Sequence, residues 1–428
     1  MKLGARAGAH LAGASALLAL AVWLSSGTMA PYASTFYRPI VSAPCQYLYN
    51  VDHPLHEAAF WMLDGQPPER WQSSIVLRRI LFPLVAYPFM KVAGFEIGGF
   101  IASLLCHLAA LAALAIDLRR RHGEDAAVAG VWLLAVYPGI TYWAALPYAN
   151  AAIVPASIAL YVLLSGLEQE AGLRATALRC LGMGLLFTAY DLAPFFGLAA
   201  LLLLLRRRRF AQLPLAAACM AAGPVVTGLL LKLAFHVAWT NRNTAIYGIV
   251  AAAYLHPPAL GIWARSLWDF PLVAVANFFY SNLLFLPALF LAIVAVTRRA
   301  LTLQEGTLLV AGAALFLFNN LAPPYAARWQ MRGFFIPRLY QPLFVGLLIY
   351  VARALGERRS LSPFKAHLLV ALSVLTFAAN ATVAFGPVAR LAWAGPVYQR
   401  FYPHSGVQTM DDNLAEYGRR PLGFCGKR

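Results

Sequence analysis

The sequence predicts an all-α, polytopic membrane protein with about 11 transmembrane helices and further helices that lie in the membrane interface. Three features of the chain support this fold class. Of its 428 residues, 61% are hydrophobic and only 12% are charged, which leaves too little polar surface to cover one or two soluble domains. Apolar runs of membrane-spanning length recur along the chain, and Arg-rich segments separate alternate runs.

The apolar runs give the helices in order. A spanning helix needs about 20 mostly apolar residues to cross a hydrocarbon core of about 30 Å. Such runs predict helices near residues 8–27, 97–117, 127–146, 150–166, 176–190, 192–205, 213–236, 271–297, 306–322, 336–355 and 366–386. The pairs around Pro147 and Asp191 are short and close together, which also fits incomplete spans that turn at the outer interface. Residues 1–386 are thus the transmembrane domain, and residues 387–428 a short tail.

The basic residues are sorted by side. Counted from a cytoplasmic N-terminus, the short inner loops contain Lys2 and Arg6, residues 119–121, Arg174 and Arg179, residues 206–209, Arg298 and Arg299, and Arg353, Arg358, Arg359 and Lys365. This distribution predicts a multi-pass protein of a bacterial cytoplasmic (inner) membrane with an extracytoplasmic C-terminus. The net charge of +17 does not indicate a nucleic-acid partner, because phosphate binding needs basic residues on a solvent-exposed domain.

The two ends of the chain leave alternatives open. A basic start, an apolar core and the residues Thr28-Met29-Ala30 also fit a cleaved signal peptide, although a retained helix suits a polytopic protein better. Cys45 and Cys425 are the two cysteines expected outside the membrane. They could form a disulfide in an oxidising compartment, but a sequence does not show whether their Cα atoms come within the required distance of about 7 Å.

The first outer segment, residues 30–96, is the longest polar stretch. It contains five of the 17 acidic residues, among them Asp52 and Glu57. An acid beside a membrane is costly unless it is paired or hydrated, so these acids together with nearby basic residues predict a polar cavity that opens outward. Residues 80–92 form an apolar stretch too short to span and interrupted by Pro83 and Pro88, which predicts an interfacial helix.

Asp52 is the first candidate for chemistry, because it lies just past the first helix at the membrane surface. A carboxylate shielded from bulk water has a raised pKa and can act as a general base toward a hydroxyl; Glu57 is the next acid on the same segment. Alternatively, Asp52 caps the helix that begins near Pro54. His53 and His56 with these acids also allow a divalent metal site, but no third ligand follows at a recognisable spacing. The sequence therefore predicts no cofactor.

Arg78 and Arg79 precede the interfacial helix and Lys91 lies near its end, where the phosphates of lipid-linked substrates would be. The guanidinium fork of Arg can hold two phosphate oxygens. The alternative is ordinary anchoring of an amphipathic helix by its basic residues.

Later outer segments supply further candidates for substrate binding. Arg328, Arg332 and Arg338 lie among aromatic residues in the segment that leads into the helix at 336–355, an arrangement suited to gripping a phosphate while rings pack on a sugar or prenyl group. The outer turns of the helical pairs contribute Tyr148, Asn150 and Asp191; Asp191 could bind substrate or cap the helix that follows it.

This arrangement resembles the GT-C superfamily of polytopic membrane glycosyltransferases, in particular its mannosyltransferase-like branch. Members typically have a catalytic Asp in the first outer loop just after the first helix, which matches Asp52 in Val51-Asp52-His53-Pro54. Many have an Arg-x-x-x-Pro-like interfacial helix later in that loop, matched by residues 78–83. Their later outer Arg, which holds the donor phosphate, corresponds to Arg332 or Arg338. Two departures are the lack of a paired acidic motif at Asp52 and the lack of room for a soluble domain after residue 388.

The resemblance implies an inverting transfer of a sugar from a polyprenyl-phosphate donor to a lipid, glycan or protein acceptor on the extracytoplasmic face. Two other functions fit the same composition. A transporter or flippase would place its site near mid-membrane on broken helices, whereas the candidate residues here lie at the outer rim. A noncatalytic assembly protein would tolerate replacement of Asp52.

Overall fold

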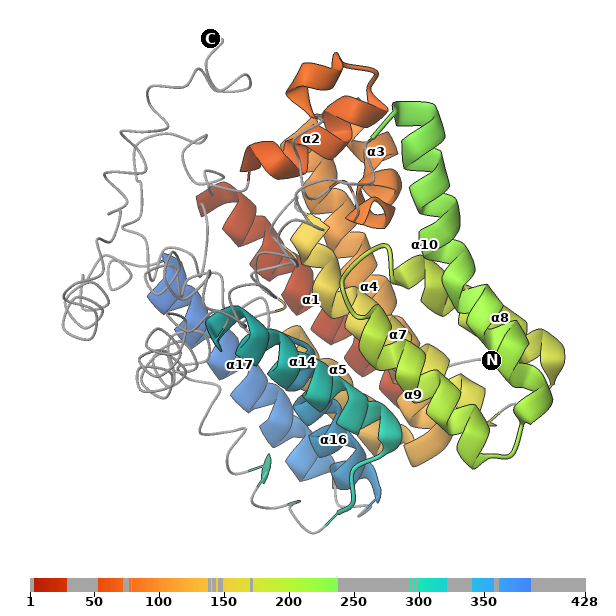
Figure 1. Ribbon diagram of the computed structural model, residues 1–428. Coiled ribbons are helices and arrows are strands. Elements are labelled where there is room, and N and C mark those ends of the chain that lie inside the picture. The colour runs from red at the N-terminus through yellow and green to blue at the C-terminus, as the bar shows by residue number, and fades with distance from the viewer. Residues whose placement is uncertain are drawn as a thin grey trace.

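The computed structural model describes residues 4–28, 53–71, 77, 79–137, 140, 144, 149–169, 172–237, 292–293, 296, 299–321, 341–357 and 362–385. These residues form an all-α structure with no β-strand among them. The helices are α1 (Ala5–Thr28), α2 (His53–Leu63), η2 (Pro68–Arg70), α3 (Leu81–Ala93), α4 (Phe95–His122), α5 (Glu124–Ala135), η4 (Ala149–Ala152), α7 (Ile153–Gln169), α8 (Leu173–Leu186), α9 (Ala193–Arg206), η5 (Phe210–Gln212), α10 (Leu213–Phe235), α14 (Leu303–Leu321), α16 (Gln341–Glu357) and α17 (Pro363–Phe385). The long helices form a bundle, and α2 and α3 lie at one end of it (Figure 1).

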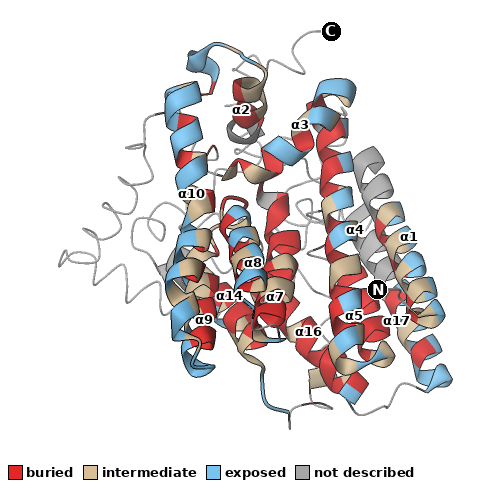
Figure 2. Cartoon of the chain, turned by 90° about the vertical axis from the view of Figure 1, so that its right-hand side faces the viewer, coloured by how far each residue is buried: buried red, intermediate tan, exposed pale blue. Residues whose placement is uncertain are grey.

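Helices α5 and α7 occupy the centre of the bundle. Helix α5 packs against α1, α4, α16 and α17, and residues 126–135 are all buried. A helix that is apolar on every side has no face for water, so it is stable only when other helices surround it. Helix α7 is also buried over most of its length, whereas α10 exposes residues along its whole length (Figure 2). One continuous hydrophobic core joins these helices.

Single glycines separate α3, α4 and α5. Gly94 has φ 84° and Gly123 has φ 91°, a backbone region that residues with a Cβ rarely adopt. Each glycine ends one helix and allows the next to begin at once in a new direction, so α3 packs back along α4, and α4 along α5.

Two other glycines allow α8 and α10 to cross closely. A Cβ added at Gly223 would collide with the backbone of Gly184, and a Cβ at Gly184 would lie 2.6 Å from the carbonyl oxygen of Met220. Close backbone approach at small residues is the usual way in which apolar helices pack when no larger side chain separates them.

The apolar runs each contain a helix where the structure describes them, but two of these helices end before the predicted bounds: α5 at Ala135 instead of residue 146, and α8 at Leu186 instead of residue 190. They correspond to α1, α4, α5, α7, α8, α9, α10, α14, α16 and α17, while the predicted helix at 271–297 lies mostly outside the described residues. Among the residues that the structure describes, two stretches, Ile97–His122 and Phe210–Phe235, are long and apolar enough to cross a membrane. Length and composition alone support this property, so the full set of membrane spans remains a prediction.

The placement of several basic residues in loops was wrong. Arg119, Arg120 and Arg121 lie in the last turn of α4, and Arg353 lies inside α16 with only 5% of the residue exposed. The helices continue past the apolar runs because these arginines find partners within the bundle: Arg121 contacts Asp117 on the same helix, and Arg353 contacts Glu305 on α14.

Candidate functional site

Two of the predicted site residues, Arg79 and Asp191, meet at the end of the bundle that bears α2 and α3. Arg79 Nη2 donates a hydrogen bond of 2.6 Å to Asp191 Oδ2. The guanidinium carbon also lies 4.2 Å from the centre of the Tyr190 ring, a cation–π distance. We call Arg79, Tyr190 and Asp191 the Arg79 cluster. It joins the segment before α3 to the turn between α8 and α9.

Local packing fixes the position of Arg79. The neighbouring side chains of Leu77 and Ile80 are buried in a small hydrophobic cluster with Trp71 and with Leu231 of α10. The backbone N–H of Leu81 donates to the carbonyl oxygen of Thr188, 3.4 Å away, which attaches the start of α3 to the α8–α9 turn. The apolar residues on either side of Arg79 are thus held in the interior, and its side chain is only 14% exposed.

Asp191 lies at the start of α9, in the bend before its first turn. The N-cap position belongs to Leu192, whose side chain makes no cap hydrogen bond. The Asp191 carboxylate is 32% exposed and is directed to Arg79. The structure therefore supports an ion-pair role for Asp191, and about a third of its side chain remains exposed.

Lys91 pairs with a different acid. It donates a hydrogen bond to Asp64, just after α2, and the Tyr87 hydroxyl lies 3.3 Å from the same carboxylate oxygen. The hydrogen bond from Lys91 lowers the pKa of Asp64, and the same bond raises the pKa of Lys91. Since Lys91 is ten residues beyond the start of α3, it lies about 15 Å along the helix axis from the Arg79 end. Arg79 and Lys91 therefore do not share one site.

Glu57 lies on α2 and is only 8% exposed. Its neighbours Ala58 and Ala59 are buried in the hydrophobic cluster that also contains Leu77 and Ile80. Helix α2 thus brings an acid close to the hydrophobic cluster that positions Arg79. A mostly buried carboxylate is one of the groups from which a general base can be made.

The remaining predicted residues cannot be placed in this arrangement. Asp52, Arg78, Tyr148, Arg328, Arg332 and Arg338 lie outside the described residues, as do Cys45 and Cys425. For two more, the structure gives the backbone only: His53 begins α2, and Asn150 lies in η4. Within the described part of the chain, no three His, Cys, Asp or Glu side chains gather as metal ligands would.

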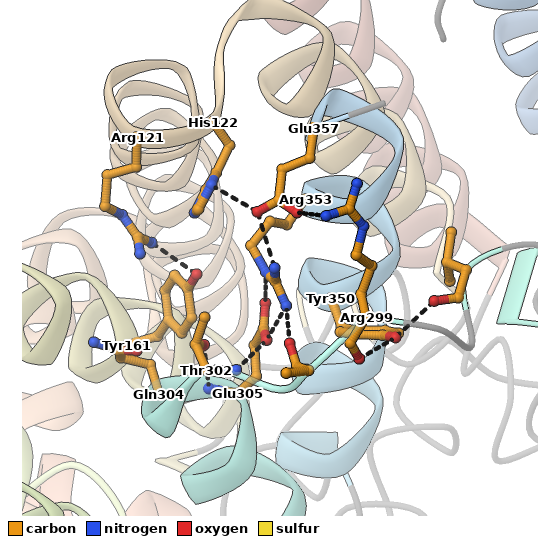
Figure 3. Close-up of polar contacts among 12 residues, drawn as sticks. Arg121, His122, Tyr161, Arg299, Thr302, Gln304, Glu305, Tyr350, Arg353 and Glu357 are labelled. Atoms are coloured by element: carbon orange, nitrogen blue, oxygen red, sulfur yellow. Dashed lines mark hydrogen bonds and ion pairs between the residues drawn. The ribbon is translucent and has the colours of Figure 1, made fainter. Parts of the chain in front are cut away.

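A second polar cluster, absent from the sequence prediction, surrounds Arg353 (Figure 3). Arg353 Nε and Nη2 donate to the two carboxylate oxygens of Glu305 at 2.7 and 2.9 Å, and Nη1 donates to Glu357 at 2.9 Å. Nη2 also donates to the carbonyl oxygen of Ala300 at 2.7 Å. The side chains of Arg353 and Glu305 are 6% and 0% exposed, so this is a buried, bidentate ion pair. We call Arg353, Glu305 and Glu357 the Arg353 cluster.

Glu305 is also part of a helix cap. The backbone N–H of Thr302 donates to Glu305 Oε2 at 2.8 Å, and the backbone N–H of Glu305 bonds to Thr302 Oγ1 at 3.2 Å. This reciprocal pattern is a capping box at the start of α14. The Tyr350 hydroxyl lies 2.8 Å from the carbonyl oxygen of Val296 and 2.9 Å from that of Arg299. The segment before α14 is thereby attached to α16.

Other charged residues extend this polar end of the bundle. His122 Nδ1 lies 3.4 Å from Glu357, and Arg121 Nη2 donates to the Tyr161 hydroxyl at 2.7 Å. Glu168 accepts from Gln304 and from Arg207, both at 2.8 Å. Asp191 of the Arg79 cluster precedes α9, and Arg207 follows it. Arg207 is connected through Glu168 to Gln304, the neighbour of Glu305 in the Arg353 cluster. Since α9 has 14 residues, the two clusters belong to opposite ends of the bundle, about 20 Å apart along α9.

The two clusters differ in what they can do chemically. In the Arg353 cluster every guanidinium nitrogen has an acceptor and Glu305 is fully enclosed, which suits a structural role. In the Arg79 cluster the acid is one-third exposed, and the cation lies in the short helical turn just before α3. A phosphate or carboxylate could exchange there with the Asp191 carboxylate.

Comparisons with protein-family models, with curated proteins and with solved structures found no match to this chain.

Proposed function

We propose that this chain is a polytopic protein of a bacterial cytoplasmic membrane, with the Arg79 cluster at the extracytoplasmic side. Its two long apolar helices support this, as do the shorter apolar helices beside them. Large apolar side chains also remain exposed on helices at the surface of the bundle, including Leu178 and Leu185 on α8, Val226 and Leu233 on α10, and Leu368 and Leu375 on α17. Exposed apolar side chains on several helices are unfavourable in water and favourable against lipid.

We propose further that the protein is a membrane glycosyltransferase that takes a sugar from a polyprenyl-phosphate donor. One observation carries this proposal: the Arg79–Asp191 ion pair joins the first outer segment to the α8–α9 turn. An Arg at that position, paired with a carboxylate that is 32% exposed, can hold the phosphate of a lipid that lies alongside the helices. The likeness of the motif around Asp52 to the GT-C pattern supports the same reaction class.

The proposed chemistry is an inverting displacement. The Asp52 carboxylate, or Glu57 if Asp52 serves only as a helix cap, takes the proton from an acceptor hydroxyl. The hydroxyl oxygen then bonds to the anomeric carbon of the sugar from the face opposite the leaving group. The bond between that carbon and the prenyl-phosphate oxygen breaks, and Arg79 offsets the negative charge on the departing phosphate, with Arg78, Arg332 or Arg338 as further cations. No cofactor enters this scheme.

The test is glycan and glycolipid analysis of a deletion strain complemented with variants. We expect wild type to restore the product, and Asp52→Asn and Arg79→Gln to restore less than about 1% of it, since the loss of a catalytic base or of a charge-stabilising donor each costs about 100-fold or more. Arg70→Gln is the matched control, because Arg70 is exposed on the same outer segment and bonds only locally, to Gln66 at 3.2 Å.

Each outcome has a defined meaning. Full rescue by Asp52→Asn together with full loss in Glu57→Gln would move the base to Glu57. Full rescue by both would remove acid–base catalysis from this segment. An unchanged glycan profile in the deletion strain would overturn glycosyl transfer altogether, whereas accumulation of an untransferred lipid-linked sugar on the cytoplasmic side would instead indicate a flippase.

A further inference from the structure

A basic surface lies at the end of the bundle opposite the Arg79 cluster. It is formed by Arg174 at the start of α8 and by Arg206, Arg207 and Arg208 at the end of α9, all of which are exposed. We call these four residues the α8–α9 basic surface. None of them takes part in the proposed reaction.

Hydrogen bonds hold the elements of this surface together. Thr176 Oγ1 on α8 donates to Gln212 Oε1 in η5 at 2.9 Å, which attaches the start of α8 to the segment after α9. Arg209 Nη1 donates to the carbonyl oxygen of Leu167 at 3.0 Å, and Arg207 donates to Glu168. The ends of α7, α8 and α9 therefore meet at this surface, so its arginines lie at the same end of the bundle.

The positive charge of the surface is only partly balanced. Among the residues the structure describes at these helix ends, Glu168 is the only acid, and it already accepts hydrogen bonds from Arg207 and Gln304. Arg174, Arg206 and Arg208 therefore present guanidinium groups toward the surroundings. Guanidinium groups bind phosphate oxygens well because two N–H donors match two acceptors.

Large apolar side chains flank these arginines in the sequence. Leu173, Leu205 and Phe210 are 57%, 41% and 61% exposed. A soluble anionic partner such as RNA would leave these side chains in water, whereas a phospholipid offers a phosphate to the arginines and an acyl chain to the apolar groups. The combination of exposed arginines and exposed apolar residues thus favours a lipid over a soluble polyanion.

We propose that the α8–α9 basic surface binds the phosphate headgroup of an anionic phospholipid in the cytoplasmic leaflet. The proposal rests on the membrane location given above but not on glycosyl transfer. Each basic residue near an anionic membrane strengthens attraction roughly fivefold. The surface therefore selects anionic over zwitterionic lipid and holds the short α8–α9 hairpin at the leaflet.

The experiment measures lipid binding to the full chain purified in a nonionic detergent. Short-chain phosphatidylglycerol and phosphatidylcholine are titrated separately, and bound lipid is counted by native mass spectrometry. We expect wild type to prefer phosphatidylglycerol by at least tenfold and the variant Arg174→Gln/Arg206→Gln to lose at least tenfold of its affinity for that lipid. The matched control is Arg70→Gln/Lys232→Gln, which removes two exposed charges that lie elsewhere and should leave the affinity unchanged.

Further arms separate the possible results. The variant Arg174→Lys/Arg206→Lys keeps both charges and should retain more binding than the Gln variant, and circular dichroism checks that each variant keeps its helix content. Inorganic phosphate should compete weakly; competition as strong as that of phosphatidylglycerol would assign the surface to free phosphate and overturn the lipid proposal. Equal binding of the two lipids by wild type, or equal losses in test and control variants, would also overturn it. Lipid binding is measured without glycosyl transfer, so failure of the lipid proposal can be distinguished from failure of the proposed glycosyltransferase function.

Discussion

Arg79 and Asp191 are 112 residues apart in the sequence, yet their side chains form an ion pair with an Nη2···Oδ2 distance of 2.6 Å. The pair connects the approach to α3 with the α8–α9 turn, and Tyr190 covers the guanidinium on one side. The contact joins two elements that are far apart in the sequence. Its contribution to the free energy of unfolding can be measured by substituting either residue.

Removing one member of this pair should destabilise the protein by about 1 to 2 kcal/mol, because the charge left behind is only partly solvated. Arg79→Gln and Asp191→Asn should each lower the unfolding temperature in detergent, and the double variant should lose less than the sum of the two. Additive losses would mean that the two side chains contribute independently and that the ion pair has no energetic role.

The Arg353 cluster should contribute more to the free energy of unfolding than the Arg79 cluster. We expect Glu305→Gln or Arg353→Met to cost about 3 to 5 kcal/mol, because each leaves a buried charge without its partner. Glu357→Gln is the control and should cost clearly less, since Glu357 is 27% exposed and contacts only one nitrogen of Arg353. The comparison is made by thermal unfolding of the purified variants. Equal losses in Glu305→Gln and Glu357→Gln would contradict the central position of Glu305.

The contact between Asp64 and Lys91 should make a pH-independent contribution near neutrality. The pKa of Asp64 is lowered from 3.8 by its bond to Lys91, so its stabilisation is present above that value and is lost as the pH falls through the lower folded pKa. The pKa of Lys91 is raised from 10.5, so its stabilisation is present below that value and is lost as the pH rises through the higher folded pKa. The difference in unfolding temperature between wild type and Asp64→Asn should therefore stay constant from about pH 5 to about pH 9 and shrink below about pH 4. A change within the central range would indicate that another group titrates with this contact.

Two glycine substitutions should have opposite signs. Gly223→Ala places a methyl group against the backbone of Gly184 and should cost about 1 to 3 kcal/mol through overpacking of the α8–α10 crossing. Gly197→Ala on α9 meets no atom within 4 Å and should stabilise by about 0.5 to 1 kcal/mol, because Ala is the better helix former. Unfolding temperatures of the two variants give the comparison. A stabilising Gly223→Ala would show that the helices can separate at this crossing without loss.

The presence of the helices could be predicted from the sequence because each lies in an apolar run, a local property, whereas some ends could not: α5 ends at Ala135, although the apolar run continues to residue 146. The start of α2 near Pro54 and the interfacial helix at 80–92 were predicted to within about one residue of their bounds. The position of Arg121 and Arg353 within helices was not predicted. Hydropathy falls where charged residues begin, but a helix continues through them when their side chains are paired.

The candidate site could be predicted only in part, because pairing over long separations leaves no local pattern. Arg79 and Asp191 were each selected for their own position, but nothing in a single sequence shows that they meet. The bond between Lys91 and Asp64 was missed for the same reason. Glu305 could have been recognised as part of a helix cap, since Thr302 precedes it by three residues in the usual capping-box spacing. Its complete burial against Arg353 had no such indicator.

The shortness of the α8–α9 hairpin has a consequence for the lipid around it. Each helix has 14 residues and is about 21 Å long, some 9 Å less than the usual thickness of a hydrocarbon core. In the membrane location that we propose, the bilayer would thin beside this hairpin and would draw water and headgroups toward Asp191. Under this proposal, acyl-chain length would govern how easily a polar headgroup reaches Arg79, and the thickness of the host membrane would set the local polarity of that ion pair.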